Sequence, residues 1–286
     1  MRRFATLPAE TRNRLLTEVS LETGIAAAII EKDFWVCWML GLLFDPAQPW
    51  GEAMVFKGGT ALSKVFGAIR RFSEDIDLSV APCVLGMNEA EMEPEVSRRQ
   101  RDRWMEGLEA ACAEWSRGTL APALEASVRA ELGSRPEGPW LEFKRDAASH
   151  SPVLLFHYPC TIGDGLAYIR RNVKLEFGSL TDQRPTGRHT VRPWLSAVVP
   201  AAAAALREVA LRQRVVDWKA KFFARSWARY DLAVPGTFRL VPPDSRLPEL
   251  ERDYAEMRQM FLDDPAGFPD IMAALRNLEQ RINQGP

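Results

Sequence analysis

The first 45 residues have the apolar spacing of helices. Pro8 is placed to begin one helix, and a longer apolar segment, IIEKDFWVCWML, follows at residues 29–40. Its large side chains recur at intervals of about three to four residues, which predicts a helix with a broad buried face. The members of this series are Ile29, Ile30, Phe34, Trp38 and Leu42.

A second pattern begins at residue 53 and changes its period twice within 30 residues. The run AMVFKGG (53–59) is short, apolar and ended by paired glycines, which predicts a strand followed by a turn. TALSKVFGAI then has helical spacing, and FSEDIDLSV (72–80) alternates like a strand. Residues 86–135 are charged and favour helix, so we expect an exposed helical insertion there.

Three further runs read as strands, namely PWLEFKRD (139–146), SPVLLFHYPC (151–160) and RRNVKLEFGSL (170–180). From about Pro193 onward the pattern predicts helix to the end, apart from a loop at residues 235–244. The pattern therefore predicts an α+β protein, in which a small mixed β-sheet with flanking helices precedes a helical C-terminal domain.

Composition narrows the class of protein further. The chain has 286 residues, with 37 Lys and Arg against 38 Asp and Glu, and 47% hydrophobic residues. This balance excludes a uniformly basic nucleic-acid coat protein, although a local basic surface stays open. Four widely spaced cysteines predict free thiols in a reducing compartment. No secretory signal and no membrane-spanning segment is present, so we expect a cytoplasmic protein.

The strongest candidate for chemistry is the segment SEDIDL. In a strand, the two-residue period places Asp75 and Asp77 on one face, while Ile76 and Leu78 face the core. Two adjacent carboxylates repel each other unless a cation lies between them, and a divalent cation with oxygen ligands fits such a site. The alternative is a solvated strand edge.

Two glycines precede this strand at the turn after residue 57. Gly58 and Gly59 allow bare backbone to approach a ligand, and the first N–H groups of the following helix can bind phosphate oxygens. Lys64, about one helical turn further on, is in reach of the same phosphates, or else is a surface lysine. The spacing matches neither a P-loop nor a dinucleotide-binding fingerprint.

A third acid is present in VKLEFG, where Lys174 and Glu176 alternate with apolar residues. If this strand neighbours the one with Asp75 and Asp77, the three carboxylates lie together. Two Mg²⁺ ions held by such acids would clamp the attacking oxygen and the leaving pyrophosphate of an in-line transfer.

At this point the chain resembles a known family. The segment FKGGTALSKVFGAIRRFSEDIDL looks like the motif of the AbiEii/AbiGii nucleotidyltransferase-toxin family, within the DNA polymerase β-like nucleotidyltransferase superfamily. IEKDFWVCWML (30–40) resembles the N-terminal helix of that family, VKLEFG its third-acid strand, and RYDL with DYAEMRQMF and LEQRIN its helical end. The likeness therefore extends over most of the chain.

The resemblance implies roles for individual residues. Asp75, Asp77 and Glu176 would bind the metals. Lys219 in VVDWKAKFF and Asp231 in ARYDL fall at the places of a catalytic lysine and aspartate, although Val215, Val216, Asp217 and Trp218 replace the usual aromatic-acid run before Lys219. The residues implied for binding the nucleoside triphosphate are Gly58, Gly59, Thr60, Lys64 and Ser73.

A basic stretch gives a candidate surface for a polyanion. Residues 207–229 contain seven Lys and Arg against two acids, and Lys221, Arg225 and Arg229 recur every four residues, so they share one face of the expected helix. These three residues are candidates for RNA contacts, and a solvated helix face is the alternative. Residues 244–270 are acidic, with eight Asp and Glu against three Arg, which cancels this charge.

The resemblance implies a nucleotidyltransferase core at residues 1–190 and a mainly helical domain at 191–286. It implies Mg²⁺-dependent transfer of a nucleoside monophosphate from an NTP to a hydroxyl, by the toxin of a toxin–antitoxin or phage-defence pair that acts on tRNA and has a cognate antitoxin. Two alternatives stay open. One is a nucleotidyltransferase with a protein or small-molecule acceptor, and the other is a non-catalytic RNA- or protein-binding relative.

Overall fold

The computed structural model divides the chain into two compact units, Met1–Arg214 and Val215–Pro286, and each unit is considered on its own. The expected domain boundary near residue 190 lies inside the first unit. The residues that the structure describes are 1–48, 50–51, 53–65, 72–87, 97–147, 149–163, 169–180, 186–198, 208–212, 241–257, 261 and 265–284.

The first unit begins with three helices, α1 (Arg2–Ala5), α2 (Ala9–Thr23) and α3 (Ala27–Leu43). Pro8 lies directly before α2, as expected from its fixed backbone angle. The helix α3 is buried on all sides, which explains why its sequence is apolar almost throughout.

One mixed sheet forms the centre of the first unit, and its described strands have the order β3-β4-β5-β2-β1-β7-β6. The central pair, β2 and β5, is parallel, whereas β2 is antiparallel to β1 and β5 is antiparallel to β4. The strands are β1 (Met54–Lys57), β2 (Ile76–Val80), β3 (Leu141–Arg145), β4 (Pro152–Phe156), β5 (Val173–Gly178), β6 (Thr186–Thr190) and β7 (Glu208–Arg212).

The first five strands lie within the runs that the sequence predicts, and α4 (Gly58–Lys64) lies within the predicted turn and helix. The prediction of helix from Pro193 onward is wrong at Glu208–Arg212, which forms β7. This segment pairs in parallel with β1 and antiparallel with β6. Because it pairs with strands on both sides, its tertiary partners override the local pattern.

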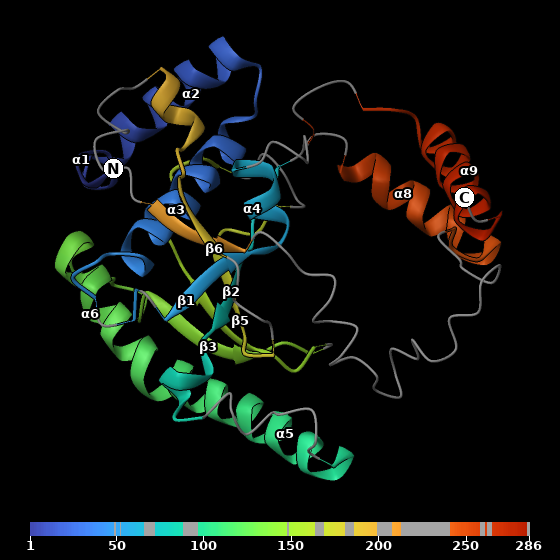
Figure 1. Ribbon diagram of the computed structural model, residues 1–286. Coiled ribbons are helices and arrows are strands. Elements are labelled where there is room, and N and C mark those ends of the chain that lie inside the picture. The colour runs from blue at the N-terminus through green and yellow to red at the C-terminus, as the bar shows by residue number, and fades with distance from the viewer. Residues whose placement is uncertain are drawn as a thin grey trace. The chain divides into compact units, whose positions relative to one another are not determined.

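The helical character of the predicted insertion is confirmed in its described part, 97–132, but the helices are not merely exposed, since Leu108, Leu124 and Val128 are buried. The helix α5 (Arg98–Trp115) begins at a Ser97–Gln100 capping box and continues through a π-helical turn, Ser116–Leu120, into α6 (Ala121–Leu132). In Figure 1 the green helices α5 and α6 follow one another along the side of the sheet where β3 lies. The described residues of this unit also include two short 3₁₀ segments, Pro82–Leu85 and Trp194–Ala197.

The hydrophobic core joins α3 to one face of the sheet. The Trp38 ring stacks on Phe156 of β4 at a centroid distance of 5.5 Å, and Trp35 meets the same ring edge-on at 5.9 Å. Ile76 and Leu78 of β2 and the apolar residues of β5 belong to the same buried cluster. The opposite face of β2 and β5 is thereby left for polar side chains.

The described part of the second unit is helical. It contains a short 3₁₀ segment (Asp244–Arg246), α8 (Leu247–Met257) and α9 (Phe268–Gln284). Tyr254 of α8 packs against Phe268 of α9 at a centroid distance of 5.9 Å. This agrees with the expected helical C-terminal domain. Across the described residues of both units, no helix combines the length and apolar character needed to cross a membrane.

Candidate active site

Three carboxylates lie on the polar face of the sheet, on two neighbouring strands. Asp77 of β2 and Glu176 of β5 are register partners, and Asp75 directly precedes β2 with the same side-chain parity as Asp77. Ile76 and Leu78, which alternate with the two aspartates, are completely buried, whereas the three acids are half-buried. The predicted alternation and the predicted neighbourhood of the two strands are therefore confirmed.

Gly58 allows the turn before α4 to approach Asp77. Its φ of 77° lies in the left-handed region, and a Cβ placed on it would come within 1.8 Å of the Asp77 Oδ2 atom. Any other residue would displace this carboxylate in addition to straining the backbone. Gly59 does not have a positive φ, but a Cβ placed on it would lie 3.1 Å from the Ser73 Oγ atom.

We expect Gly58→Ala to lower activity by about tenfold or more and stability by roughly 1–2 kcal/mol, because alanine is strained at positive φ and displaces Asp77. Urea unfolding and the rate of transfer check this. Gly24→Ala is the matched control, since Gly24 also has a φ of 72° but no atom within 4 Å of its Cβ position. Equal activity of the two variants would contradict the role assigned to Gly58.

Thr60 connects α4 to the chain before β2. Its hydroxyl donates to the backbone carbonyl of Asp75 and lies 2.9 Å from Ser73 Oγ, and the residue is almost completely buried. This contact fixes the segment that enters the Asp75–Asp77 strand. The nucleotide-binding roles implied for Gly58, Gly59, Thr60 and Ser73 stay predictions.

Lys64 contacts residues other than the three acids. Its ammonium pairs with the buried Asp33 carboxylate, donates to the Arg192 carbonyl at 3.1 Å and lies 4.3 Å from the centre of the Trp194 ring. Its side chain is only 6% exposed. The contact with phosphate that the resemblance implies stays a prediction, while the structure gives Lys64 a buried partner.

Three consecutive charged residues of α3 bind segments around the site, and the sequence alone suggests no role for them. Each reaches a different segment. Glu31 accepts hydrogen bonds from the Thr161 N–H and hydroxyl, both at 2.7 Å. Lys32 pairs with Glu74 and donates to the Arg170 carbonyl at 2.9 Å.

Asp33, the third of these charged residues, pairs with Lys64 and accepts a hydrogen bond from the Trp194 N–H at 2.8 Å. Burial raises the pKa of Asp33, and Lys64 and this hydrogen bond oppose the shift. Buried charges persist only when they are paired, so these residues fix α4 and the loops around the site. In the sequence, the signal for this buried pairing is the presence of three charged residues inside an otherwise apolar helix.

Glu176 is bound to neighbouring side chains. Lys174 Nζ lies 2.8 Å from Glu176 and also 2.8 Å from Asp146, and the Ser149 hydroxyl donates to Glu176 Oε1 at 3.3 Å. Burial lowers the pKa of Lys174, but its hydrogen bonds to Asp146 and Glu176 outweigh this and raise the pKa overall. An ammonium group therefore neutralises the third acid.

The pKa values of Asp75 and Asp77 are both raised. Burial is the largest cause for each, and the nearby charges of Glu74 for Asp75 and of Glu176 for Asp77 add to it. Lys57 acts against the shift at Asp77. Ionised carboxylates in this environment destabilise one another, and a bound divalent cation would relieve that repulsion.

The donor set suits a hard cation such as Mg²⁺, because it consists of carboxylate oxygens on one face beside a glycine turn. Among the residues that the structure describes, no group of three or more Asp, Glu, His or Cys is already gathered closely enough to hold a metal ion. Glu176 is paired with Lys174, so it would exchange this ion pair for a metal ion in order to join Asp75 and Asp77 as a ligand.

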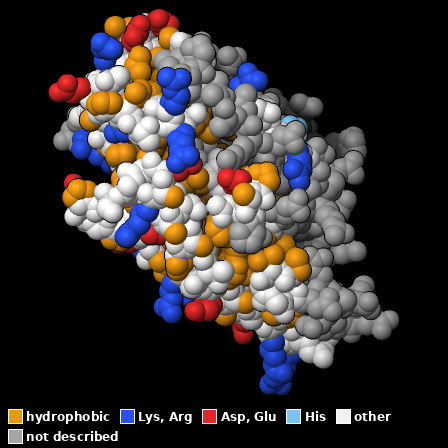
Figure 2. Space-filling view, turned by 90° about the vertical axis from the view of Figure 1, so that its left-hand side faces the viewer, with side chains coloured by type: hydrophobic (Ala, Val, Ile, Leu, Met, Phe, Trp, Pro, Cys, Tyr) orange, Lys and Arg blue, Asp and Glu red, His pale blue; other side chains and the backbone are white. Residues whose placement is uncertain are grey.

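Five other candidate residues lie outside the described part of the chain. These are Lys219, Asp231, Lys221, Arg225 and Arg229. Among the described residues on the face shown in Figure 2, Lys and Arg are scattered among acidic and hydrophobic side chains.

The family described as "Nucleotidyl transferase AbiEii toxin, Type IV TA system" matches residues 41–210. Among solved structures, the chain is similar to MenT4, a nucleotidyltransferase toxin from Mycobacterium tuberculosis H37Rv, with 17% identity and a TM-score of 0.36. That match covers 71% of this chain and 55% of the other. No curated protein matches the sequence.

Proposed function

Because the chain belongs to the AbiEii nucleotidyl transferase toxin family, we propose that it transfers a nucleoside monophosphate from an NTP to a hydroxyl group. One observation carries this proposal. Asp77 and Glu176 are paired across parallel strands, Asp75 has the same parity, and the glycine turn comes within reach of Asp77. Carboxylates beside a bare backbone turn suit a polyphosphate held with a cation.

The proposed reaction forms one bond and breaks another. The acceptor oxygen attacks the α-phosphorus of the NTP, the bond from that phosphorus to the β-phosphate oxygen breaks, and pyrophosphate leaves. The hydroxyl proton passes to solvent water. Positioning and charge stabilisation account for most of the catalysis in transfers of this kind.

Asp75, Asp77 and Glu176 are the residues that would hold Mg²⁺, with two ions expected. When bound, Mg²⁺ would supply charge neutralisation for the phosphates and the leaving oxygen. The chain's own residues bind and orient the nucleotide. In this proposal the backbone at Gly58 and Gly59 lies against the phosphates, with Thr60, Ser73 and Lys64 behind it.

The remaining residues and partners rest on the family resemblance. Lys219 and Asp231 are proposed as further catalytic residues, and Lys221, Arg225 and Arg229 as contacts to RNA. The proposed acceptor is tRNA, the proposed setting is the cytoplasm, and the proposed protein partner is a cognate antitoxin of a toxin–antitoxin or phage-defence pair. A basic helix face would attract a phosphate backbone in this role.

The test is to incubate the full chain and Mg²⁺ with each α-labelled ribonucleoside triphosphate in turn, together with total tRNA. We expect label on tRNA, and we expect EDTA to abolish it because the acids then lack their cation. Denaturing gels separate labelled tRNA from labelled protein, and thin-layer chromatography detects small products. Label on protein or on a small molecule alone would replace the acceptor, and the absence of any labelled product would refute the transferase proposal.

A further inference from the structure

Both carboxylate oxygens of Glu176, the third acid, contact a hydrogen-bond donor. Lys174 Nζ lies 2.8 Å from its Oε2 atom, and the Ser149 hydroxyl donates to its Oε1 atom at 3.3 Å. Mg²⁺ is bound in proteins through carboxylate oxygens, and an ammonium group repels an incoming cation. Glu176 can therefore join Asp75 and Asp77 as a metal ligand only when the Lys174 ammonium moves away from it.

A single residue, Asp146, contacts both of these donors. It directly follows β3, and its Oδ2 atom lies 2.8 Å from Lys174 Nζ. Its Oδ1 atom accepts a hydrogen bond from the Ser149 N–H at 3.0 Å. Glu176, Lys174, Asp146 and Ser149 thus form a closed ring of contacts, in which each carboxylate contacts both the ammonium and the serine.

The charged members of this ring are mostly shielded from water. The side chains of Lys174 and Asp146 are each 25% exposed, and that of Glu176 is 26% exposed. Charges with most of their surface buried depend on their partners, because the partners replace lost hydration. Lys174 can therefore leave Glu176 at low cost only if a second carboxylate is already in place.

The turn between β3 and β4 presents Asp146 and Ser149 in a defined conformation. The His150 N–H donates to the Asp146 carbonyl at 3.0 Å, and the Asp146 N–H donates to the Ser151 carbonyl at 2.9 Å. These bonds hold His150 in a left-handed conformation, with φ of 57°, which is uncommon outside glycine.

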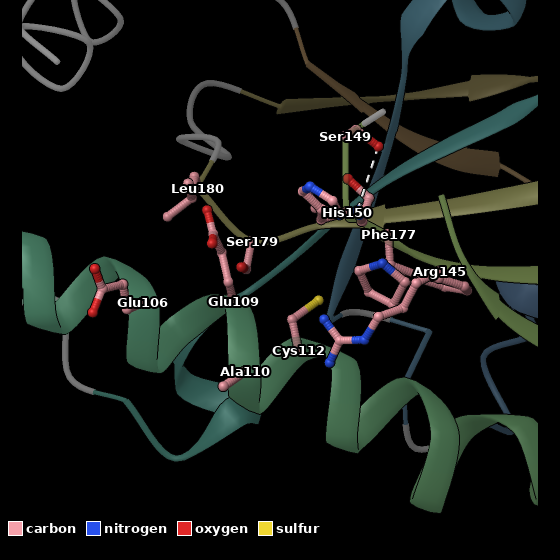
Figure 3. A pocket seen from close by; sticks show the side chains of 13 residues that line it. Glu106, Glu109, Ala110, Cys112, Arg145, Ser149, His150, Phe177, Ser179 and Leu180 are labelled. Atoms are coloured by element: carbon pink, nitrogen blue, oxygen red, sulfur yellow. Dashed lines mark hydrogen bonds between the residues drawn. The ribbon is translucent and has the colours of Figure 1, made fainter. Parts of the chain in front are cut away.

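The shape of this turn comes from its own hydrogen bonds rather than from the helix α5. Figure 3 shows Ser149 and His150 on one side of a cavity of about 440 Å³, with residues of α5 such as Glu109 and Cys112 on the other. The dashed line in that view marks the hydrogen bond that the Ser151 N–H donates to the Ser149 hydroxyl at 3.4 Å. Asp146, which accepts from this turn and donates to it, is its central residue.

We propose that Asp146 is a positioning residue of the transferase, which keeps the Lys174 ammonium when Glu176 turns to the metal site. Without the cation, the ammonium is shared between the two carboxylates. With the cation bound, Lys174 stays paired with Asp146 and Glu176 is available as the third ligand. This inference rests on the proposed function, since it takes Glu176 as a metal ligand, and it adds the residue that controls when this acid is available.

Asp146 could also act on a cation through its own negative charge. The geometry favours the route through the lysine, because Lys174 Nζ lies at the same distance of 2.8 Å from Asp146 and from Glu176. The two routes differ in one respect. Only the route through Lys174 disappears when the charge of the lysine is removed.

The experiment uses three variants of the full chain. Asp146→Asn keeps an Oδ1 acceptor for the Ser149 N–H but removes the charge that faces Lys174. Lys174→Met removes the ammonium and keeps an unbranched side chain of similar length. The double variant combines both changes and closes the cycle, so that the coupling between the two residues is measured directly.

Glu142→Gln is the matched control. It removes an equal charge from β3, at a position where the carboxylate contacts Lys144 and His157 rather than Lys174. The probe is Mn²⁺, a cation that takes the same oxygen ligands as Mg²⁺. Its binding to each protein without NTP is followed by the electron paramagnetic resonance signal of the free ion, and Mg²⁺ is then added as a competitor.

We expect Asp146→Asn to weaken Mn²⁺ binding by about tenfold, because Lys174 then has only Glu176 as a partner. Glu142→Gln should change it by less than about twofold. Lys174→Met alone should strengthen binding, since no ammonium competes for Glu176. In the Lys174→Met background, adding Asp146→Asn should change the affinity by less than about twofold. Urea unfolding checks that each variant is folded.

Two results would overturn the inference. The first is unchanged Mn²⁺ affinity in Asp146→Asn. The second is an equal loss of affinity with and without Lys174, since Asp146 would then act by its own charge. If Asp146→Asn does not fold, Lys174→Met decides, because unchanged or weaker binding in that variant would contradict competition for Glu176.

The binding measurement also separates this inference from the proposed function. If the wild type labels no acceptor but the variants follow the expected pattern of Mn²⁺ affinities, the transferase proposal fails and the role of Asp146 stands. If the wild type labels an acceptor and the pattern is absent, the role of Asp146 fails and the transferase proposal stands. A wild type without saturable, Mg²⁺-competed Mn²⁺ binding would likewise refute the role of Asp146.

Discussion

Replacing Asp77 with Asn is expected to lower kcat of nucleotide transfer by about a thousandfold, or roughly 4 kcal/mol of transition-state stabilisation. The variant keeps the shape of the side chain but removes the charge nearest to Gly58 and to the register partner Glu176. Single-turnover rates at saturating Mg²⁺ measure the effect. Asp253→Asn, at an exposed position of α8, is the control and should leave kcat unchanged.

The same substitution is expected to stabilise the folded chain in the absence of Mg²⁺. Burial, followed by the charges of Glu176 and Asp75, raises the folded-state pKa of Asp77 despite Lys57. A raised carboxyl pKa contributes stability that is present below the unfolded pKa and is lost as pH rises through the folded pKa. At neutral pH the ionised Asp77 is therefore a cost, which Asn removes.

Thermal unfolding tests this consequence. Asp77→Asn should raise Tm at pH 7 by roughly 2 °C, and the gain should shrink as the pH is lowered, because the wild-type carboxyl then becomes protonated. Mg²⁺ should raise Tm of the wild type more than that of the variant. A fully active Asp77→Asn protein, or one whose Tm responds to Mg²⁺ like the wild type, would contradict the assignment of this acid.

Replacing Asp33 with Ala is expected to destabilise the first unit by about 3–5 kcal/mol. The substitution leaves Lys64, with only 6% of its side chain exposed, without its carboxylate partner, and it removes the acceptor of the Trp194 N–H. A buried ammonium without a partner is costly because it has lost its hydration. Urea unfolding measures the change in the free energy of unfolding.

Two comparison variants make this test specific. In the double variant Asp33→Ala and Lys64→Met, the charge that was left unpaired is also removed, so much of the lost stability should return. Glu114→Ala breaks the exposed Arg117–Glu114 pair and should cost less than about 1 kcal/mol. A cost of this small size for Asp33→Ala would show that the buried pair does not hold α4 in place.

Most of the strand-forming segments could be predicted, because their side chains alternate or form short apolar runs bounded by turn residues. Ile76 and Leu78 are completely buried while Asp75 and Asp77 are only half-buried, and the alternation of apolar and acidic residues that produces this difference is visible in the sequence. The strand β7 was not predictable in this way. It is stabilised by pairing with β1 and β6, which are distant in sequence.

The candidate site, like the fold, could be predicted from the sequence only in part. The sequence pattern identifies the acids and the paired glycines, but not the contacts of Lys64. In the sequence Lys64 lies about one helical turn after the glycines, which suggests phosphate binding, whereas in the structure it pairs with Asp33 of α3. The partners of Glu31 and Lys32 were also not predictable, because they lie on loops far along the chain.

By itself, the sequence determined which residue types alternate, where the chain turns, and that three acids and a glycine pair are available for phosphate chemistry. These properties are local, since they follow from side-chain period and from the conformational freedom of glycine. The tertiary structure alone decided that Glu176 lies beside Asp77, that Lys64 is buried against Asp33, and that a cavity opens beside Ser149. Those contacts join segments far apart in the chain, and only the packing of the whole unit determines which segments meet.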